Sequence, residues 1–121
     1  MSTNIEKGTY DPAELSQKRN LLQVFLMEEM GAKHKDEEAR KFQKELAEKF
    51  GALFSKIIDT SKDNDTIKTL FMSGDYKEAS LIVLEDLKLE PELQNEENAA
   101  YLQKVIETLE KLKFELRSNR N

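Results

Sequence analysis

The sequence contains no cysteine, and this absence removes a whole group of possible chemistries. Without a thiol the chain has no disulfide, no thiolate nucleophile, and no cysteine-ligated zinc or iron–sulfur centre. The single histidine, His34, stands between two lysines, without an orienting or ligating group nearby in the sequence. We interpret His34 as an exposed turn residue. The sequence therefore predicts no catalytic residue, no cofactor and no metal, and we expect that the protein is not an enzyme.

Long apolar runs and basic clusters are missing as well. The densest apolar segment, residues 21–27, contains Gln23 and is followed by two glutamates, so it falls far short of the roughly 18 residues of a membrane span. Residues 1–10 lack the apolar core and the positive charge of a signal peptide. The formal net charge is -5, and no dense basic stripe is present to attract phosphates. We expect a soluble, cytoplasmic protein with neither a membrane nor a nucleic acid as its partner.

Two patterns that could indicate metal ligands fail on their spacing. Asp59, Asp63 and Asp65 resemble the start of a calcium loop, but neither of the first two places glycine at position six or glutamate at position twelve. Carboxylate sites in helix bundles pair glutamates with a Glu-x-x-His motif, whereas Gly31 stands three residues before His34. Neither pattern therefore predicts a metal site.

Glycine and proline are scarce, with four glycines and two prolines in 121 residues, while the strong helix formers Glu, Lys, Leu and Ala dominate. Few windows alternate between apolar and polar residues, so a sheet is not expected. The predicted fold is all-α, a compact four-to-five-helix bundle with up-and-down helical hairpins. We expect a flexible N-terminal leader at residues 1–10, a single helical domain at 11–117 and a flexible C-terminal tail at 118–121.

Apolar spacing and turn residues predict where the helices lie. The first helix begins at Pro12, with Asp11 as its N-cap. Apolar residues lie all around its second half, which predicts a central, widely buried helix. In the second, Gly51 suggests the close approach of a neighbouring helix. We expect helices one, two and the last to form the core. The predicted segments are helices at Pro12 to about Met30, roughly Glu37 to Ile58, Thr66–Met72, Tyr76–Leu89 and from between Glu92 and Asn98 to Arg117, with a polar loop at Asp59–Asp65.

The last helix carries the clearest pattern in the chain. Its apolar residues are spaced three, four, three and four apart, which predicts one continuous apolar face that must be buried against this chain or another protein: Leu102, Val105, Leu109, Leu112 and Leu116. A two-stranded coiled coil would leave Phe114 at its most exposed position, and Ile106 widens the face beyond a two-stranded seam. We therefore favour burial inside the bundle, with a coiled-coil dimer as the alternative.

Charge is unevenly spread along the C-terminal third. Residues 84–110 hold eight acidic side chains against two lysines, whereas residues 111–121 hold four basic side chains and one glutamate. Acid at the start and base at the end of a helix complement the helix macrodipole, and this explanation suffices. The functional alternative is an acidic docking patch beside a basic tip.

Residues 74–91 resemble the second half of a tetratricopeptide repeat. The segment opens with Gly74-Asp75-Tyr76, and twelve residues separate Ala79 from Pro91, as in that family. The preceding residues depart from the repeat, and no second copy follows at its 34-residue period. A glycine that ends one helix, an aspartate that caps the next and a proline that ends it would give the same sequence pattern without any evolutionary relationship. The resemblance implies a helical hairpin used for binding and not for catalysis.

These observations favour a non-enzymatic protein–protein interaction module, such as an adaptor, a small regulatory protein or a subunit of a larger assembly. Its partner would be another protein or a second copy of itself. The alternatives are a structural protein that dimerises through its C-terminal helix, a small helix-shielding chaperone, or an enzyme or small-ligand binder with a polar-lined pocket between helices. Because aromatic residues and arginine are enriched among binding hot spots, the predicted contact residues are Tyr76, Tyr101, Lys113, Phe114 and Arg117.

Overall fold

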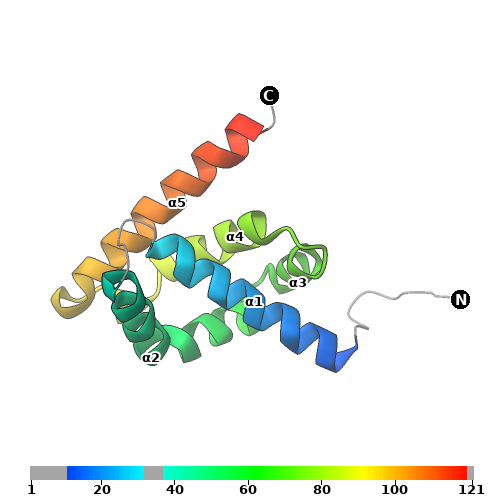
Figure 1. Ribbon diagram of the computed structural model, residues 1–121, viewed down its shortest axis with the longest axis horizontal. Helices are drawn as coiled ribbons and strands as arrows, with labels where there is room; N and C mark the ends of the chain where they lie inside the picture. Colours follow the sequence, from blue (N-terminus) through cyan, green and yellow to red (C-terminus); the bar gives the residue numbers. More distant parts are fainter. Residues whose placement is uncertain (1–10, 32–36, 120–121) are drawn as a thin grey trace, which may run out of the picture.

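A computed structural model describes residues 11–31 and 37–119, and these residues form helices and turns without a strand. The elements are α1 (Pro12–Met30), α2 (Glu37–Thr60), α3 (Asn64–Met72), α4 (Tyr76–Lys88) and α5 (Ala99–Asn119), with 3₁₀ turns at Pro91–Leu93 and Glu96–Asn98 (Figure 1). The predicted all-α bundle is confirmed. The predicted leader at residues 1–10, the turn around His34 and residues 120–121 lie outside the described residues.

The polar loop predicted for Asp59–Asp65 is present but shorter than predicted, because α2 continues to Thr60 and α3 begins at Asn64. The Thr60 hydroxyl donates to the Lys56 carbonyl at 2.7 Å, and the Ser61 amide donates to the Ile57 carbonyl at 2.9 Å. Only residues 61–63 separate α2 from α3. Polar composition alone therefore exaggerated the length of this connection.

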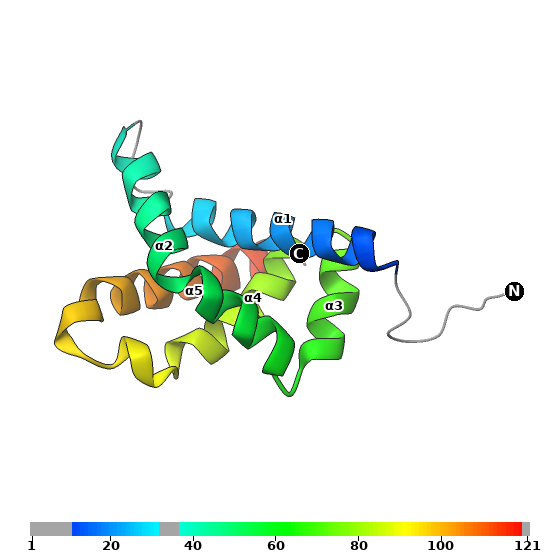
Figure 2. The same ribbon diagram turned by 90° about the horizontal axis from the view of Figure 1, so that it is seen from below.

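The core is centred on α4, which the sequence did not single out. This helix packs against α1, α2, α3 and α5, and in both views it lies between them (Figures 1 and 2). Ala79, Val83, Leu84 and Leu87 are all at most 1% exposed. The prediction that the first, second and last helices form the core was wrong in omitting α3 and α4. Although α4 is short, its buried positions recur at i, i+4 and i+8, so it presents a wide apolar face to several neighbours.

The expectation that α1 is central and widely buried is also wrong. This helix lies along the outside of the bundle (Figure 2) and buries only one face, through Leu22, Leu26 and Met30. Leu21 and Val24, on its other side, remain 45% and 47% exposed. Because the chain is short, the remaining helices do not reach around α1 to cover these side chains.

The middle of the predicted α5 stripe is buried within this chain, while Leu102 and Leu116 at its ends are half-buried. Val105, Leu109 and Leu112 are each at most 1% exposed, and α5 packs most extensively against α4. The C-terminal part of α5, coloured red, extends past α4 in Figure 1. This helix continues to Asn119 and so includes the first two residues of the predicted tail. Burial inside the bundle, which we favoured over a coiled-coil seam, accounts for the stripe.

Gly51 does not serve a close helix approach, which corrects the sequence-based expectation. A β-carbon placed on Gly51 would meet no described atom within 4 Å, apart from its own helix backbone and chain neighbours. Packing therefore does not require glycine at this position of α2.

Candidate interaction surface

A tight turn between α3 and α4 fixes the first residue of the candidate surface. Gly74 has φ +84°, a left-handed conformation that favours glycine. Its amide donates to the Phe71 carbonyl at 3.2 Å, and the Asp75 amide donates to the Leu70 carbonyl at 2.8 Å. These two hydrogen bonds form the Schellman pattern that closes a helix C-terminus. The turn sets the direction in which α4 begins and so places Tyr76 next to α1.

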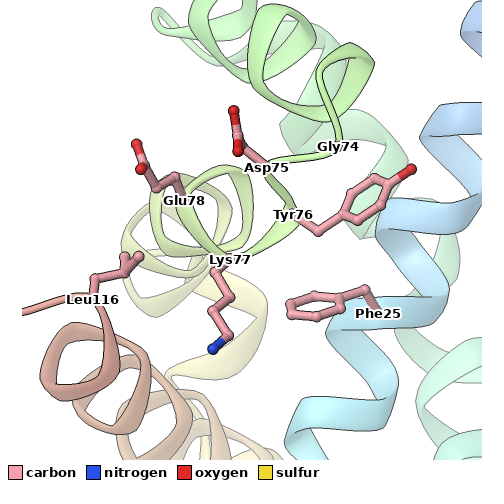
Figure 3. Close-up of a pocket in the computed structure, with 7 residues that line it drawn as sticks. All are labelled: Phe25, Gly74, Asp75, Tyr76, Lys77, Glu78 and Leu116. Atoms are coloured by element: carbon pink, nitrogen blue, oxygen red, sulfur yellow. The ribbon is translucent and has the colours of Figure 1, made fainter. Parts of the chain in front are cut away.

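At the start of α4 lies an open hollow of about 340 Å³, which we call the hollow. It is lined by Phe25 from α1, residues 74–78 and Leu116 from α5 (Figure 3). The rings of Phe25 and Tyr76 have their centroids 6.0 Å apart and are tilted by 33°. Three elements that are distant in sequence thus bring apolar side chains to one place on the surface.

The hollow continues into exposed apolar surface along α1. Leu21 precedes Phe25 by four residues and Val24 by three, so these side chains are neighbours on the outer side of the helix. We call Leu21, Val24 and Phe25 the α1 strip. Single exposed apolar residues are common, but adjacent ones beside a lined hollow are a usual sign of a binding site. The sequence signal for the strip was present in the apolar residues that surround the second half of α1, although we assigned them to the core.

Charged residues are arranged unevenly around the hollow. Lys77 lies in its lining, where its amine forms an ion pair with Glu115 of α5 at 3.3 Å. In Figure 3, Asp75 and Glu78 extend along the side opposite Phe25. Asp75 occupies the predicted N-cap position of α4, yet among the described residues its side chain makes no capping hydrogen bond. The Asp75 carboxylate is therefore available to a group outside this chain.

Of the predicted contact residues, Tyr76 lies in the hollow, whereas Tyr101 lies in a packed aromatic cluster. The Tyr101 ring stacks with Phe42 at 5.8 Å between centroids and meets Phe50 edge-on at 5.1 Å. The Lys49 amine lies 5.3 Å from the centre of the Tyr101 ring. Burial, followed by the charge and hydrogen bond of the Glu45 carboxylate, raises the pKa of Tyr101. These contacts give Tyr101 a clear packing role.

Lys113 joins α5 to α4 through an ion pair with Glu85 at 3.3 Å. Burial acts to raise the pKa of Glu85, but hydrogen bonds and charge from Lys113 and Lys88 outweigh it and lower the pKa overall. The Lys113 amine also approaches Glu110 at 3.9 Å. Lys113 thus has intramolecular partners that hold the C-terminal helix against α4.

Phe114 and Arg117 are exposed on the outer side of α5, and Phe114 retains 67% exposure. Phe114 lies two residues from both Leu112 and Leu116, a rotation of about 200° around the helix, so it faces away from the hollow. Tyr101 is thirteen residues from Phe114, or about 20 Å along the axis. The structure therefore does not bring the five predicted contact residues together on one surface.

A second hollow of about 340 Å³ surrounds Leu89 at the opposite end of α4. Leu89 is 72% exposed, but most of the other residues in this lining are polar or charged: Thr60, Ser61, Lys62, Asp86 and Glu90. The apolar surface there does not continue along a helix, so the hollow beside α1 is the stronger candidate.

The described part of the chain bears on two other kinds of site, metal centres and membrane spans. Within residues 11–31 and 37–119, His, Cys, Asp and Glu nowhere gather in a group of three or more that could hold a metal ion. None of the helices in the same ranges combines the length and apolarity needed to cross a membrane. No family model, curated protein or solved structure matches this chain. The likeness of residues 74–91 to a tetratricopeptide hairpin thus rests on those residues alone.

Proposed function

We propose that the protein is a cytoplasmic, non-enzymatic interaction module of the adaptor, regulatory or subunit type, which binds a different protein through the α1 strip and the hollow. The observation that carries this proposal is the continuity of apolar surface from Leu21 and Val24 to Phe25, Tyr76 and Leu116. Contacts of this kind supply the apolar centre of protein–protein interfaces.

Burial of the α5 stripe inside the bundle also supports the α1 strip and the hollow as the binding surface. Val105, Leu109 and Leu112 have no exposed area to offer a second α5, so a dimer built on that stripe would require the bundle to open. The α1 strip, in contrast, can be covered without disturbing the core. A helix-shielding chaperone would use the same surface and belongs to the same proposal.

Capture from an extract, compared between matched variants, tests the proposal. Leu21→Ser combined with Val24→Ser removes apolar surface at two exposed positions and leaves the core intact. Leu89→Ser is the matched control, because it removes an even more exposed apolar side chain at the other hollow. We expect proteins that are enriched on the unmodified chain to remain on Leu89→Ser and to be lost from the double variant.

Circular dichroism and thermal melting establish that both variants are folded before capture. Proteins retained equally by the double variant and lost from Leu89→Ser would contradict the proposal and place the binding surface at the opposite end of α4.

A further inference from the structure

We propose that the occupant of the hollow is an amphipathic helix with basic flanking residues, supplied by a different protein. This inference rests on the proposed function, since it specifies the partner of the same surface. It goes further in assigning the partner's secondary structure and charge, and each assignment follows from a separate observation.

The charge of the partner follows from three uncompensated carboxylates around the apolar surface. Glu28 lies one turn beyond Val24 on α1, while Asp75 and Glu78 line the opposite side of the hollow. All three residues are exposed. Within residues 11–31 and 37–119, no ion pair or side-chain hydrogen bond engages any of these carboxylates. Apolar surface is thus bordered by negative charge on two sides.

Lys77 in the lining and Lys111 and Lys113 of α5 do not cancel this charge, because each has a carboxylate of its own. Lys18 of α1, three residues before Leu21, forms no ion pair among the described residues. The ion pairs are Lys77 with Glu115 at 3.3 Å, Lys111 with Glu29 at 2.7 Å and Lys113 with Glu85 at 3.3 Å. With these cations engaged, the three border carboxylates act together on anything that approaches the hollow. A partner with lysine or arginine beside its apolar anchors complements them and is steered toward the surface.

The helical form of the partner follows from the shape and length of the surface. A cavity of about 150 Å³ is large enough for a benzene ring, so a hollow of about 340 Å³ accepts one or two large side chains. The α1 strip extends the apolar surface by a further turn beyond Phe25. Anchors at i, i+3 or i+4 and i+7 of an incoming helix match a surface of this extent between α1 and α5.

A second copy of this chain fits the hollow less well. Among the residues that the structure describes, the exposed aromatic side chain of such a copy would be Phe114, with Arg117 one turn away. Phe114 faces away from the hollow on its own chain, so inserting it into a neighbour's hollow makes a head-to-tail contact. Such contacts propagate into open chains unless their rotation closes a ring. A helix from a different protein has no such restriction.

The test uses two synthetic helical peptides of about 18 residues with leucine at the anchor spacing and a fluorescent label. One carries lysine at the flanking positions and the other carries glutamate. Fluorescence anisotropy with the full chain measures both affinities. We expect the basic peptide to bind about tenfold more tightly, as a few exposed ion pairs would produce. Raising the salt from about 0.05 to 0.3 M should reduce this preference through screening.

Two triple variants then locate the charge. Asp75→Asn with Glu28→Gln and Glu78→Gln should reduce the preference for the basic peptide to about twofold or less. The matched control removes three exposed carboxylates near the start of α5, through Glu92→Gln, Glu96→Gln and Glu97→Gln, and should retain the preference. Both variants change the net charge equally, so a difference between them reports position alone.

Each result decides one part of the inference. Equal binding of both peptides, abolished by Leu21→Ser with Val24→Ser, would overturn the basic partner and leave the interaction surface in place. Binding of neither peptide would overturn the helical occupant, while capture from an extract would still decide the proposed function. If the border variant does not fold, the comparison of the two peptides on the unmodified chain remains decisive.

Discussion

At the scale of single residues, Gly51 and Gly74 show how differently one amino acid can serve the same fold. Gly51 lies within α2 with open space where a β-carbon would stand, whereas Gly74 has φ +84° in the turn before α4. Glycine within a helix lowers the stability of the fold by about 1 kcal/mol relative to alanine. A residue that carries a β-carbon lowers it by about as much when it must adopt a left-handed conformation.

Gly51→Ala should therefore raise the free energy of unfolding by about 0.5–1 kcal/mol, and Gly74→Ala should lower it by about 1 kcal/mol or more. Urea unfolding of both variants, with unchanged dependence on denaturant concentration, checks the pair. A destabilised Gly51→Ala would mean that a neighbour packs against that position.

Tyr101 makes stability depend on alkaline pH. Burial and the Glu45 carboxylate raise its pKa above the ordinary value of 10.0, so the folded state holds the phenolic proton more tightly than the unfolded state does. This contribution is complete below pH 10 and is lost as the pH rises through the higher pKa of the folded state. Tyr101→Phe lacks the ionisation and should lose less stability above pH 10.

The measurement is the difference in melting temperature between the two chains from about pH 8 to about pH 11. Because all other ionisable residues are the same in both chains, the comparison isolates Tyr101. Parallel curves would contradict the shifted pKa of Tyr101.

At the scale of whole elements, α5 should be indispensable to folding. Its three fully buried side chains, Val105, Leu109 and Leu112, each contribute roughly 1.5–3 kcal/mol, or about 5–9 kcal/mol together. Typical domains are stable by only 5–15 kcal/mol. A chain that ends at Leu93 should therefore lose cooperative thermal unfolding, monitored by circular dichroism. A truncated chain that still melts cooperatively would show that α1 to α4 form a core of their own.

The sequence predicts helix positions well where punctuation and periodicity agree. Pro12 and Gly31 bound α1, Gly74 separates α3 from α4, and the spacing of α5 predicts its buried face. Each of these signals is local, because it depends on backbone angles or on the turn of one helix. Local signals were enough for the fold class and for most helix bounds.

The candidate surface could not be predicted in the same way, because it depends on tertiary placement. Phe25, Tyr76 and Leu116 are separated by 51 and 40 residues, and only packing brings them together. On α1, apolar residues surround the helix, so periodicity gives no direction that distinguishes Leu22, which is buried, from Leu21, which is exposed. Tyr76 was predicted from residue type alone, and its neighbours were missed.

At the scale of the whole molecule, we expect the outer side of α5 to contribute neither to the core nor to binding. Phe114→Asp changes an exposed side chain on the outer side, so the melting temperature should remain within a few degrees of the unmodified value. Our proposal also predicts that Phe114→Asp still binds any partner that the double variant, Leu21→Ser with Val24→Ser, no longer binds. Capture of that partner by the variants decides between the surfaces. If Phe114→Asp no longer bound that partner, binding would be assigned to the outer side of α5, where the aromatic residue type alone predicted it.

The central claim is that α5 completes the core of a monomer and leaves the α1 strip to a different protein. Absolute mass by light scattering, over about a hundredfold range of concentration, tests this claim most directly. We predict a mass of 14.0 kDa throughout. A mass that rises toward twice this value, and returns to the monomer in Leu21→Ser with Val24→Ser, would contradict the claim by giving the strip to a second copy of the chain.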